Sequence, residues 1–248
     1  MKPLIKTTLI LSALWLAGCS STTAQQAAPV TNDPKDPLES LNRSVWTFNY
    51  DYLDAYVLRP ATVGYMTVVP KPARTGLSNM VNNLNEPANF INGLLQGKPT
   101  GSAVSAGRFL LNSTVGVAGL FDVATPMGLG VQEEDFGQTL GVWGVGHGPY
   151  LMIPARGPST VRNIAGDVVD NLYFPMSVLN TPQTIGKFVI GALSAREQLM
   201  AQEKLLNDSL DPYAFVKDAY FQRQDYQQYD GNPPEQSVDE AALEEFLE

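Results

Sequence analysis

The sequence contains one cysteine and one histidine in 248 residues. A single cysteine excludes a disulfide within the chain and the cysteine-rich zinc sites, and a single histidine leaves too few ligands for the other common zinc sites. We therefore expect no metal site and no cofactor. A Ser-His-Asp triad stays open, because a triad needs only one histidine, which here would be His147.

Basic residues are also few. Lys and Arg number 16 against 25 Asp and Glu, so the formal net charge is −9. An acidic protein repels phosphate backbones, and nucleic acid is therefore not expected as a partner. The apolar fraction of 44% is ordinary, and a chain of this length is expected to bury a substantial apolar core.

Long uninterrupted apolar runs are also missing from the part of the sequence that has few charged residues. Residues 136–155 carry no charged side chain, but five glycines and two prolines interrupt them, so a transmembrane helix is not expected there. Apolar residues that alternate around glycine predict two short strands and a tight turn within 140–153. A helix that carries Arg162 and Asp170 is predicted to follow, with Ser159 as its N-cap.

The charge-poor region extends further toward the N-terminus. Residues 109–155 carry four charges, and all four are acidic. That much uncharged, glycine-rich chain belongs in a core or in lipid. We expect irregular and short helical structure that lies in one face of a bilayer and is supported by neighbouring segments. The acidic run Glu133-Glu134-Asp135 is interpreted as a solvated turn.

The N-terminus is typical of an exported lipoprotein. Residues 1–18 combine two lysines with a short apolar run, as a secretory signal peptide does. Leu16-Ala17-Gly18-Cys19 resembles the bacterial lipobox, in which the cysteine is acylated and becomes the first mature residue. Acyl chains on Cys19 would anchor the protein stably, and serine at position 20 implies the outer membrane of a Gram-negative cell. Residues 19–35 would form the lipidated N-terminus and a flexible tether.

The first helix is predicted to begin at Asp36. This residue suits the N-cap, with Pro37 at the first helical position and Glu39 completing a capping box. Arg59-Pro60 is expected to end the helix. Its apolar face is broad and rich in Trp and Tyr, which suits either a protein core or a membrane interface. Its clearly polar strip consists of Ser40, Ser44, Thr47, Asp51 and Asp54.

Proline and glycine divide the remaining chain into short helices. Two are predicted within 72–84 and 87–97, and two more begin at Thr181-Pro182 and Asp211-Pro212. The side chains expected to face inward are Ile185, Phe188, Val189, Ala192 and Leu193 on the first of the latter pair and Phe215, Val216, Ala219 and Tyr220 on the second. From residue 229 onward, prolines and acids predict a disordered acidic tail.

No catalytic motif is complete. Gly144, Gly146 and Gly148 do not match the GxGxxG spacing of a nucleotide loop, and no GxSxG elbow is present. His147 lies in this glycine-rich turn and is interpreted as a loop residue, so no catalytic residue is expected. A periplasmic lipid hydrolase that uses His147 and a structural envelope lipoprotein stay as alternative functions.

Four segments together resemble the MlaA (VacJ) lipoprotein family. They are DPLESLNRSVWTFNYDYLDAYVLRP from Asp36, PARTGLSNMVNNLNEPANFINGLLQG from Pro72, FGQTLGVWGVGHGPYLMIP from Phe136 and DPYAFVKDAYFQR from Asp211. The likeness covers nearly everything between residues 36 and 224. Residues 36–228 are therefore interpreted as one lipid-transport domain, and 229–248 are the least similar part.

The resemblance implies a mainly α fold, a ring-like bundle of short amphipathic helices with one small β-hairpin that is embedded in one membrane leaflet. It implies a periplasm-facing outer-membrane lipoprotein without enzymatic activity. Such a protein removes mislocalised phospholipid from the outer leaflet through an amphipathic channel and so maintains lipid asymmetry. The implied partners are phospholipids, a trimeric outer-membrane porin and a periplasmic carrier of the MlaC type, which receives the lipid for return to the inner membrane.

A polar route through an apolar body would allow a headgroup to avoid hydrocarbon, where unpaired polar groups cost several kcal/mol. We expect the polar strip of the first helix, or the polar side of the helices that follow it, to line that route and the glycine-rich hairpin to shape or gate its opening. The residues expected to line or gate the channel are Ser40, Ser44, Thr47, Phe48, Asp51, Gly141, Gly144, Gly146, Pro149 and Tyr150.

Overall fold

The computed structural model describes residues 33–234. The predicted signal peptide, the predicted anchor Cys19, and residues 20–32 and 235–248 of the predicted tether and tail lie outside the described residues. All structural statements below concern the described part of the chain.

The described chain is mainly α-helical with one small two-stranded antiparallel sheet, which confirms the predicted fold class. The elements in order are α2 (Glu39–Thr47), η1 (Phe48–Leu58), α3 (Arg59–Val68), α4 (Lys71–Asn83), α5 (Glu86–Leu95), α6 (Pro99–Thr114), η2 (Thr125–Met127), α7 (Phe136–Val142), β1 (Tyr150–Ile153), β2 (Gly157–Thr160), α8 (Val161–Asp170), η3 (Met176–Val178), α9 (Thr181–Leu199), η4 (Met200–Gln202), α10 (Glu203–Asn207) and α11 (Pro212–Gln228).

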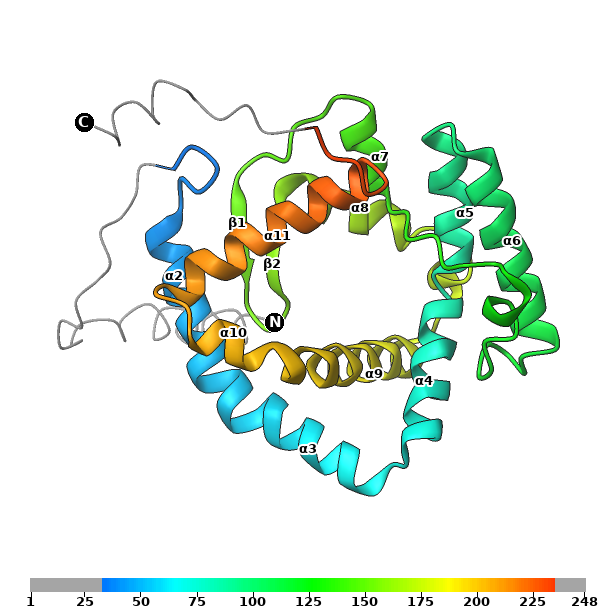
Figure 1. The fold of residues 1–248 in the computed structure, drawn as a ribbon, viewed down its shortest axis with the longest axis horizontal. Helices are drawn as coiled ribbons and strands as arrows, with labels where there is room; N and C mark the ends of the chain where they lie inside the picture. Colours follow the sequence, from blue (N-terminus) through cyan, green and yellow to red (C-terminus); the bar gives the residue numbers. More distant parts are fainter. Residues whose placement is uncertain (1–32, 235–248) are drawn as a thin grey trace, which may run out of the picture. The chain divides into compact units, whose positions relative to one another are not determined.

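These elements follow one another around a ring (Figure 1). Contacts close the circuit, because α3 and α4 both pack against α9, α8 and α11 both pack against α7, and α2 packs against β1. The helices α5 and α6 form an antiparallel pair at one side of the ring. Among residues 33–234, no helix combines the length and the apolar character needed to cross a bilayer.

One continuous helical rod extends over residues 39–68 through α2, η1 and α3. Its middle part has π-helical hydrogen bonds, as shown by the N–H of Arg59, which donates to the carbonyl of Asp54. The predicted helix end at Arg59-Pro60 is therefore wrong. A proline ring normally clashes with the carbonyl four residues earlier, and the wider π-helical turn relieves that clash.

The start of this rod also differs from the prediction. It begins at Glu39 without a side-chain cap, so Asp36 is not the N-cap. The buried carboxylate of Asp36 instead accepts a hydrogen bond from Asn42 Nδ2 at 2.8 Å. It also accepts one from the Tyr213 hydroxyl at 2.5 Å and one from Lys217 Nζ at 3.4 Å. Asp36 therefore joins the beginning of the rod to α11.

The β-hairpin exists, but it lies further along the chain than predicted. Strand β1 pairs with β2 so that Tyr150 is opposite Thr160. The first residues of the predicted hairpin, 140–142, belong to helix α7, which Asp135 caps by accepting a hydrogen bond from Gln138 N–H at 2.7 Å. Ser159 belongs to β2, and Thr160 is the N-cap of α8. The glycines of α7 misled the prediction because they serve close helix packing instead of a turn.

The starts of α9 and α11 confirm the predicted positions, but much of the predicted inward faces is wrong. Asn180 and Gln183 form a capping box at α9, and Asp211 accepts hydrogen bonds from two N–H groups of α11. Tyr220 packs against the small core as predicted. The side chains of Ile185, Phe188, Val189, Phe215 and Ala219, predicted to face inward, are exposed, and the buried positions of α11 are Tyr213, Lys217, Phe221 and Gln224.

These apolar side chains are exposed because, in the described chain, polar residues occupy most of the buried positions. Its buried apolar residues are five, namely Ala124, Tyr150, Met152, Tyr213 and Phe221, whereas twenty polar or charged residues are buried. Large apolar side chains are exposed on nearly every helix. The expected substantial apolar core is therefore wrong. The small core packs Trp46 of the first helix against Tyr213, while Tyr52 and Tyr56 of the same rod face outward, so the aromatic face serves both core and surface.

Arginine side chains hold neighbouring segments together in place of an apolar core. Arg108 of α6 donates to Glu86 Oε1 of α5 at 2.5 Å, and both residues are almost fully buried. Arg196 of α9 donates to both carboxylate oxygens of Asp54 in the rod, at 2.6 and 2.8 Å. Buried ion pairs of this kind are strongly destabilising to break from one side, because the remaining charge is left without a partner.

Helices also cross closely where glycine removes the side chain. At the contact of α7 and α8, a Cβ atom on Gly166 would overlap the backbone of Gly137. At the contact of α5 and α6, a Cβ atom on Gly93 would lie 2.5 Å from Ser102 Oγ. Gly186 of α9, by contrast, has open space around it.

We expect Gly166→Ala to destabilise the protein by about 1–3 kcal/mol, because α7 and α8 must move apart. Gly186→Ala should stabilise it by roughly 0.5–1 kcal/mol, since alanine is the better helix former and meets no neighbour. Thermal unfolding of the two variants in detergent, followed by circular dichroism, measures both effects. Equal shifts in the same direction would contradict the packing of α7 on α8.

Candidate functional site

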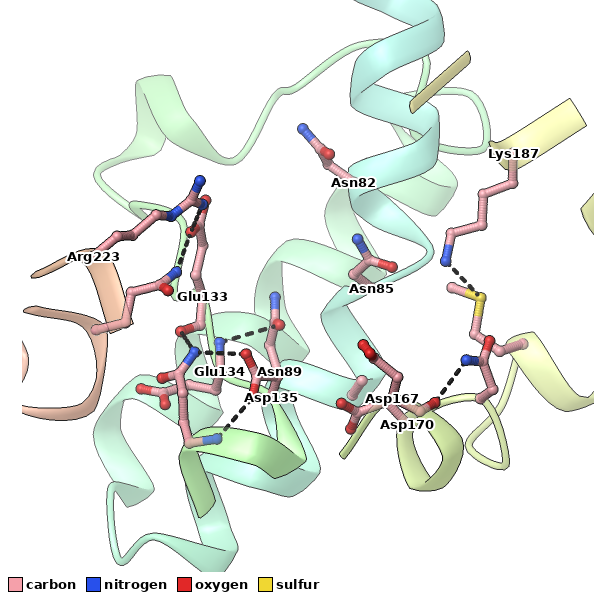
Figure 2. A pocket seen from close by; sticks show the side chains of 15 residues that line it. Asn82, Asn85, Asn89, Glu133, Glu134, Asp135, Asp167, Asp170, Lys187 and Arg223 are labelled. Carbon is pink, nitrogen blue, oxygen red and sulfur yellow. Dashed lines mark hydrogen bonds and ion pairs between the residues drawn. The ribbon is translucent and has the colours of Figure 1, made fainter. Parts of the chain in front are cut away.

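A polar cavity of about 380 Å³ lies among segments from opposite sides of the ring (Figure 2). It is bounded by the end of α4, by α5, by the segment that leads into α7, and by α8, α9 and α11. Its lining residues are Asn82, Asn85, Ala88, Asn89, Glu133, Glu134, Asp135, Gln138, Asp167, Asp170, Asn171, Met176, Lys187, Arg223 and Gln227. Nearly all of them are polar, whereas the outward faces of the same helices carry exposed apolar side chains.

The asparagine side of the cavity is fixed by the junction of α4 and α5. Pro87 and the turn at Asn85 separate the two helices, and Asn89 follows one turn into α5. The Asn89 side chain donates to Glu86 Oε2 at 3.2 Å and accepts from the N–H of Glu134 at 3.3 Å. Because Glu86 is itself paired with Arg108, the position of this wall depends on the ion pair between α5 and α6.

Asp170 joins three helices at the floor of the cavity. Its Oδ1 accepts from Asn92 Nδ2 of α5 at 2.8 Å, and its Oδ2 accepts from the N–H of Phe136, the first residue of α7, at 3.0 Å. Burial raises the pKa of Asp170, and these two hydrogen bonds oppose that shift. The carboxylate thus ties α8 to α5 and α7 while one face of the same helix lines the cavity.

Lys187 supplies a cation from α9 on the other wall. Its Nζ donates to the thioether sulfur of Met176 at 3.2 Å, which is a weak acceptor. Burial lowers the pKa of Lys187, and the charges of Asp167 and Asp170 act in the opposite direction. In Figure 2 its side chain extends toward the cavity from the side opposite Arg223 and Glu133. No carboxylate within residues 33–234 forms an ion pair with Lys187.

The channel residues predicted from the sequence lie elsewhere. Ser40, Ser44, Thr47, Phe48 and Asp51 are exposed on α2 and η1. The remaining five follow in α7, in the loop after it and in β1: Gly141, Gly144, Gly146, Pro149 and Tyr150. None of the ten is among the residues that line the described cavity, and their role in a channel or gate stays a prediction.

The structure brings these ten residues into two groups that differ in burial. Gly141 is buried against Arg162 and Gln228, and Tyr150 is fully buried in the aromatic core. Gly144 has a φ of +89° and open space around it, which is the positive-φ turn that the sequence predicted for this region. Gly141 and Tyr150 are therefore packed inside the protein, whereas Gly144 lies in an exposed loop.

The residues that line the cavity could not be recognised from the sequence as one site. Asn82, Asn85 and Asn89 recur at intervals of three and four residues, as one helical face would, but the break at Glu86-Pro87 hid that pattern. Lys187 was the clearest available signal, because it is the one basic residue between Arg162 and Arg196. A lone charge inside an otherwise apolar helix marks a position that faces a polar interior.

His147 is held by two charged neighbours. Its Nε2 lies 3.1 Å from Asp225 Oδ1, and its Nδ1 lies 2.9 Å from Arg162 Nη2. Because a guanidinium can only donate, Nδ1 is the acceptor and Nε2–H donates to Asp225. Both ring nitrogens are therefore occupied, and neither is available to take a proton from a serine hydroxyl. This geometry does not support the alternative of a hydrolase that uses His147.

The acidic run before α7 is not simply a solvated turn. Glu134 Oε1 accepts from Lys98 Nζ at 3.0 Å, and burial raises the pKa of Glu134 against the opposing effect of that lysine. Asp135 caps α7, and Glu133 accepts from Gln227 Nε2 at 3.0 Å. Among residues 33–234 there is no group of three or more acidic, histidine or cysteine side chains suited to hold a metal ion.

Comparisons with known proteins agree on one family. A family model described as MlaA lipoprotein matches residues 34–227. A protein of Shigella flexneri named intermembrane phospholipid transport system lipoprotein MlaA is 40% identical over 96% of this chain and 95% of its own length. Proteins of the same name from Escherichia coli and Haemophilus influenzae are 39% and 36% identical, over 96% and 90% of this chain.

A solved structure agrees with these relatives. It is described as the structural basis for maintenance of bacterial outer membrane lipid asymmetry, and it superposes with a TM-score of 0.74 at 44% sequence identity. The match covers 78% of this chain and 98% of that chain.

The environment of His147 predicts a pH dependence. Burial and the charge of Arg162 lower the pKa of His147 in the folded state, and Asp225 opposes them. The unfolded chain therefore takes up a proton at a higher pH, close to about 6.5, than the folded chain does. The stability that neutral His147 contributes should be present above this pH and be lost as pH falls below it. The measurement is the difference in Tm between the wild type and His147→Gln at pH 8.0 and pH 5.5; a difference that does not change with pH would contradict the assignment.

Proposed function

The chain belongs to the MlaA lipoprotein family, and we propose that it removes mislocalised phospholipid from the outer leaflet of the outer membrane and so maintains the lipid asymmetry of that membrane. The names of the curated relatives support intermembrane phospholipid transport, and the match to the solved structure supports a role in lipid asymmetry. We propose transport without catalysis, and the occupied ring nitrogens of His147 are consistent with this view.

The proposal includes an anchor and partners. Acyl chains on Cys19 would hold the protein at the outer membrane, residues 19–35 would act as a tether, and the body would lie in the periplasm-facing leaflet. A trimeric porin would lie beside it. A soluble periplasmic carrier of the MlaC type would receive each phospholipid and return it toward the inner membrane. These points rest on the family and on the lipobox-like sequence at Cys19.

The observation that carries the proposal is the polar cavity inside a body with an apolar surface. A phospholipid headgroup that enters hydrocarbon loses its hydrogen bonds to water, and a charged one costs still more to transfer. Asparagine amides, carboxylates and one ammonium would replace part of that hydration. A cavity of about 380 Å³ suits a headgroup better than a whole lipid, so the acyl chains would stay in apolar surroundings.

Lys187 gives the direct test. Reversal of its charge by Lys187→Glu would put a third carboxylate beside Asp167 and Asp170 and repel a phosphate. We expect lipid removal to slow about tenfold, which corresponds to roughly 1.4 kcal/mol at the barrier. Surface-exposed phospholipid, measured with a reagent that labels only the outer leaflet, should rise in cells that carry this variant in place of the wild type.

The matched control is Lys71→Glu, which makes the same charge change at an exposed position of α4 away from the cavity. Its cells should resemble the wild type at equal protein level. If Lys187→Glu and Lys71→Glu give the same amount of surface phospholipid, the cavity is not the transport route. Release of lysophospholipid or fatty acid by the purified wild-type protein would contradict transport without catalysis.

A second test concerns the depth of the apolar surface. Leu110, Phe121 and Leu205 are similarly exposed, at 63%, 59% and 64%. We propose that the first two meet hydrocarbon and that Leu205, on the short helix α10, does not. Leu110→Lys or Phe121→Lys should therefore weaken membrane integration by about 2–3 kcal/mol, and Leu205→Lys should have little effect. Extraction of each variant from membranes by mild detergent measures the difference, and equal extraction of all three would place residues 110–121 outside the bilayer.

A further inference from the structure

The cavity carries both signs of charge. Its lining includes the five carboxylates of Glu133, Glu134, Asp135, Asp167 and Asp170 and the two cations of Lys187 and Arg223. A route for lipid must accept the charge of the headgroup, so the balance of charges that are not already neutralised decides which headgroups fit.

Three of the carboxylates have cationic partners. Glu134 pairs with Lys98 at 3.0 Å, Glu133 lies 3.4 Å from Arg223, and Asp167 pairs with Arg156. Lys98 and Arg156 do not line the cavity, so they neutralise Glu134 and Asp167 from outside it, whereas Arg223 pairs with Glu133 within the lining.

Three charges of the lining are left without an ion pair among the described residues: Asp135, Asp170 and Lys187. Asp135 and Asp170 accept hydrogen bonds only from neutral donors, which leaves their negative charge in place. Lys187 donates to a neutral sulfur, which leaves its positive charge in place. Burial disfavours the charged form of both Asp170 and Lys187, so a ligand that brought the opposite charges would stabilise both.

Neutral donors and acceptors are also available beside these charges. The side-chain amides of Asn82 and Asn85 line the cavity and make no hydrogen bond to other residues of 33–234. Figure 2 shows Asn82 near the end of α4 and Asn85 in the turn that follows, both above Asp167 and Asp170 in this view. Unbonded amides at a polar wall can receive the oxygens of a phosphodiester or glycerol group.

We propose that the cavity prefers phospholipids whose headgroup is zwitterionic and bears an amine, such as phosphatidylethanolamine, over anionic phospholipids such as phosphatidylglycerol. This inference rests on the proposed function. The phosphate would lie at Lys187, and the ammonium would lie at the uncompensated carboxylates of Asp170 and Asp135. The headgroup of phosphatidylglycerol supplies the same phosphate for Lys187 but ends in a neutral glycerol, which leaves the negative charges of Asp170 and Asp135 without a cation.

The experiment uses the purified full-length lipoprotein in detergent. It is incubated with mixed micelles of equimolar phosphatidylethanolamine and phosphatidylglycerol that have identical acyl chains, and the bound lipid is quantified by mass spectrometry after separation. We expect the ethanolamine lipid to be enriched about three- to fivefold over the glycerol lipid. Raising the salt concentration should reduce the enrichment.

Two variants test the assignment of charges. Asp170→Asn should bring the bound ratio close to one, but Asp170 also joins three helices and its replacement could unfold the protein. Asp135→Asn removes the other carboxylate of the lining that has no ion pair among residues 33–234, while asparagine can still accept the hydrogen bond from Gln138 N–H that caps α7, and it should lower the enrichment about twofold. Asp218→Asn, at an exposed position of α11, is the matched control and should keep the wild-type ratio.

The outcomes separate this inference from the function on which it rests. Bound lipid at the bulk ratio in the wild type, or an Asp135→Asn ratio equal to that of Asp218→Asn, would overturn the headgroup preference while lipid binding stands. Absence of bound lipid of either kind, with the protein folded, would overturn the proposed function as well.

Discussion

A protein whose outer surface is apolar has little apolar area left to bury, and that constraint determines how this chain folds. Twenty polar residues occupy buried positions within 33–234, so buried hydrogen bonds and ion pairs must do what an apolar core does in a water-soluble protein. Arg196 pairs with Asp54 and Arg74 with Glu197, and each pair joins two segments that are distant in sequence. Arg108 joins the consecutive helices α5 and α6. Where a hydrogen-bonding partner is absent, glycine lets two helices approach closely, as at Gly166. The polar cavity is continuous with this interior, because Asp170 and Asn89 belong to both.

Local signals in the sequence predicted the local features of the fold. Asp211 caps α11, Gly97 ends α5 with a φ of +77°, and Thr181 begins α9, because each of these depends on a few adjacent residues. The hairpin was predicted as well, although too early in the chain, since glycine signals close packing in α7 as readily as it signals a turn.

The side of each helix that is buried could not be predicted in the same way. The usual rule that apolar residues point inward is reversed in much of this chain, so Phe188 and Phe215 were assigned to the wrong side. Ser40 and Asp51, which the sequence favoured as channel residues, are exposed on the rod, and their role stays a prediction. Cavity residues come from six α-helices, the short helix η3 and the connecting segments between helices, and no spacing within one segment relates Asn85 to Lys187. The family resemblance predicted a polar route through the protein, and the three-dimensional arrangement identified the polar cavity that we propose as part of it.

The division between a polar interior and an apolar exterior has a consequence for protein engineering. Exposed side chains such as Leu110 and Phe188 contribute little to the contacts that hold the ring together, because those contacts are made by buried polar groups. Replacement of many outward apolar residues at once by polar ones should therefore change the solvent that the protein prefers more than the structure that it adopts. The outward apolar residues of the described ring could therefore be exchanged while its buried polar contacts and its polar cavity stay the same. Such a variant would need no detergent.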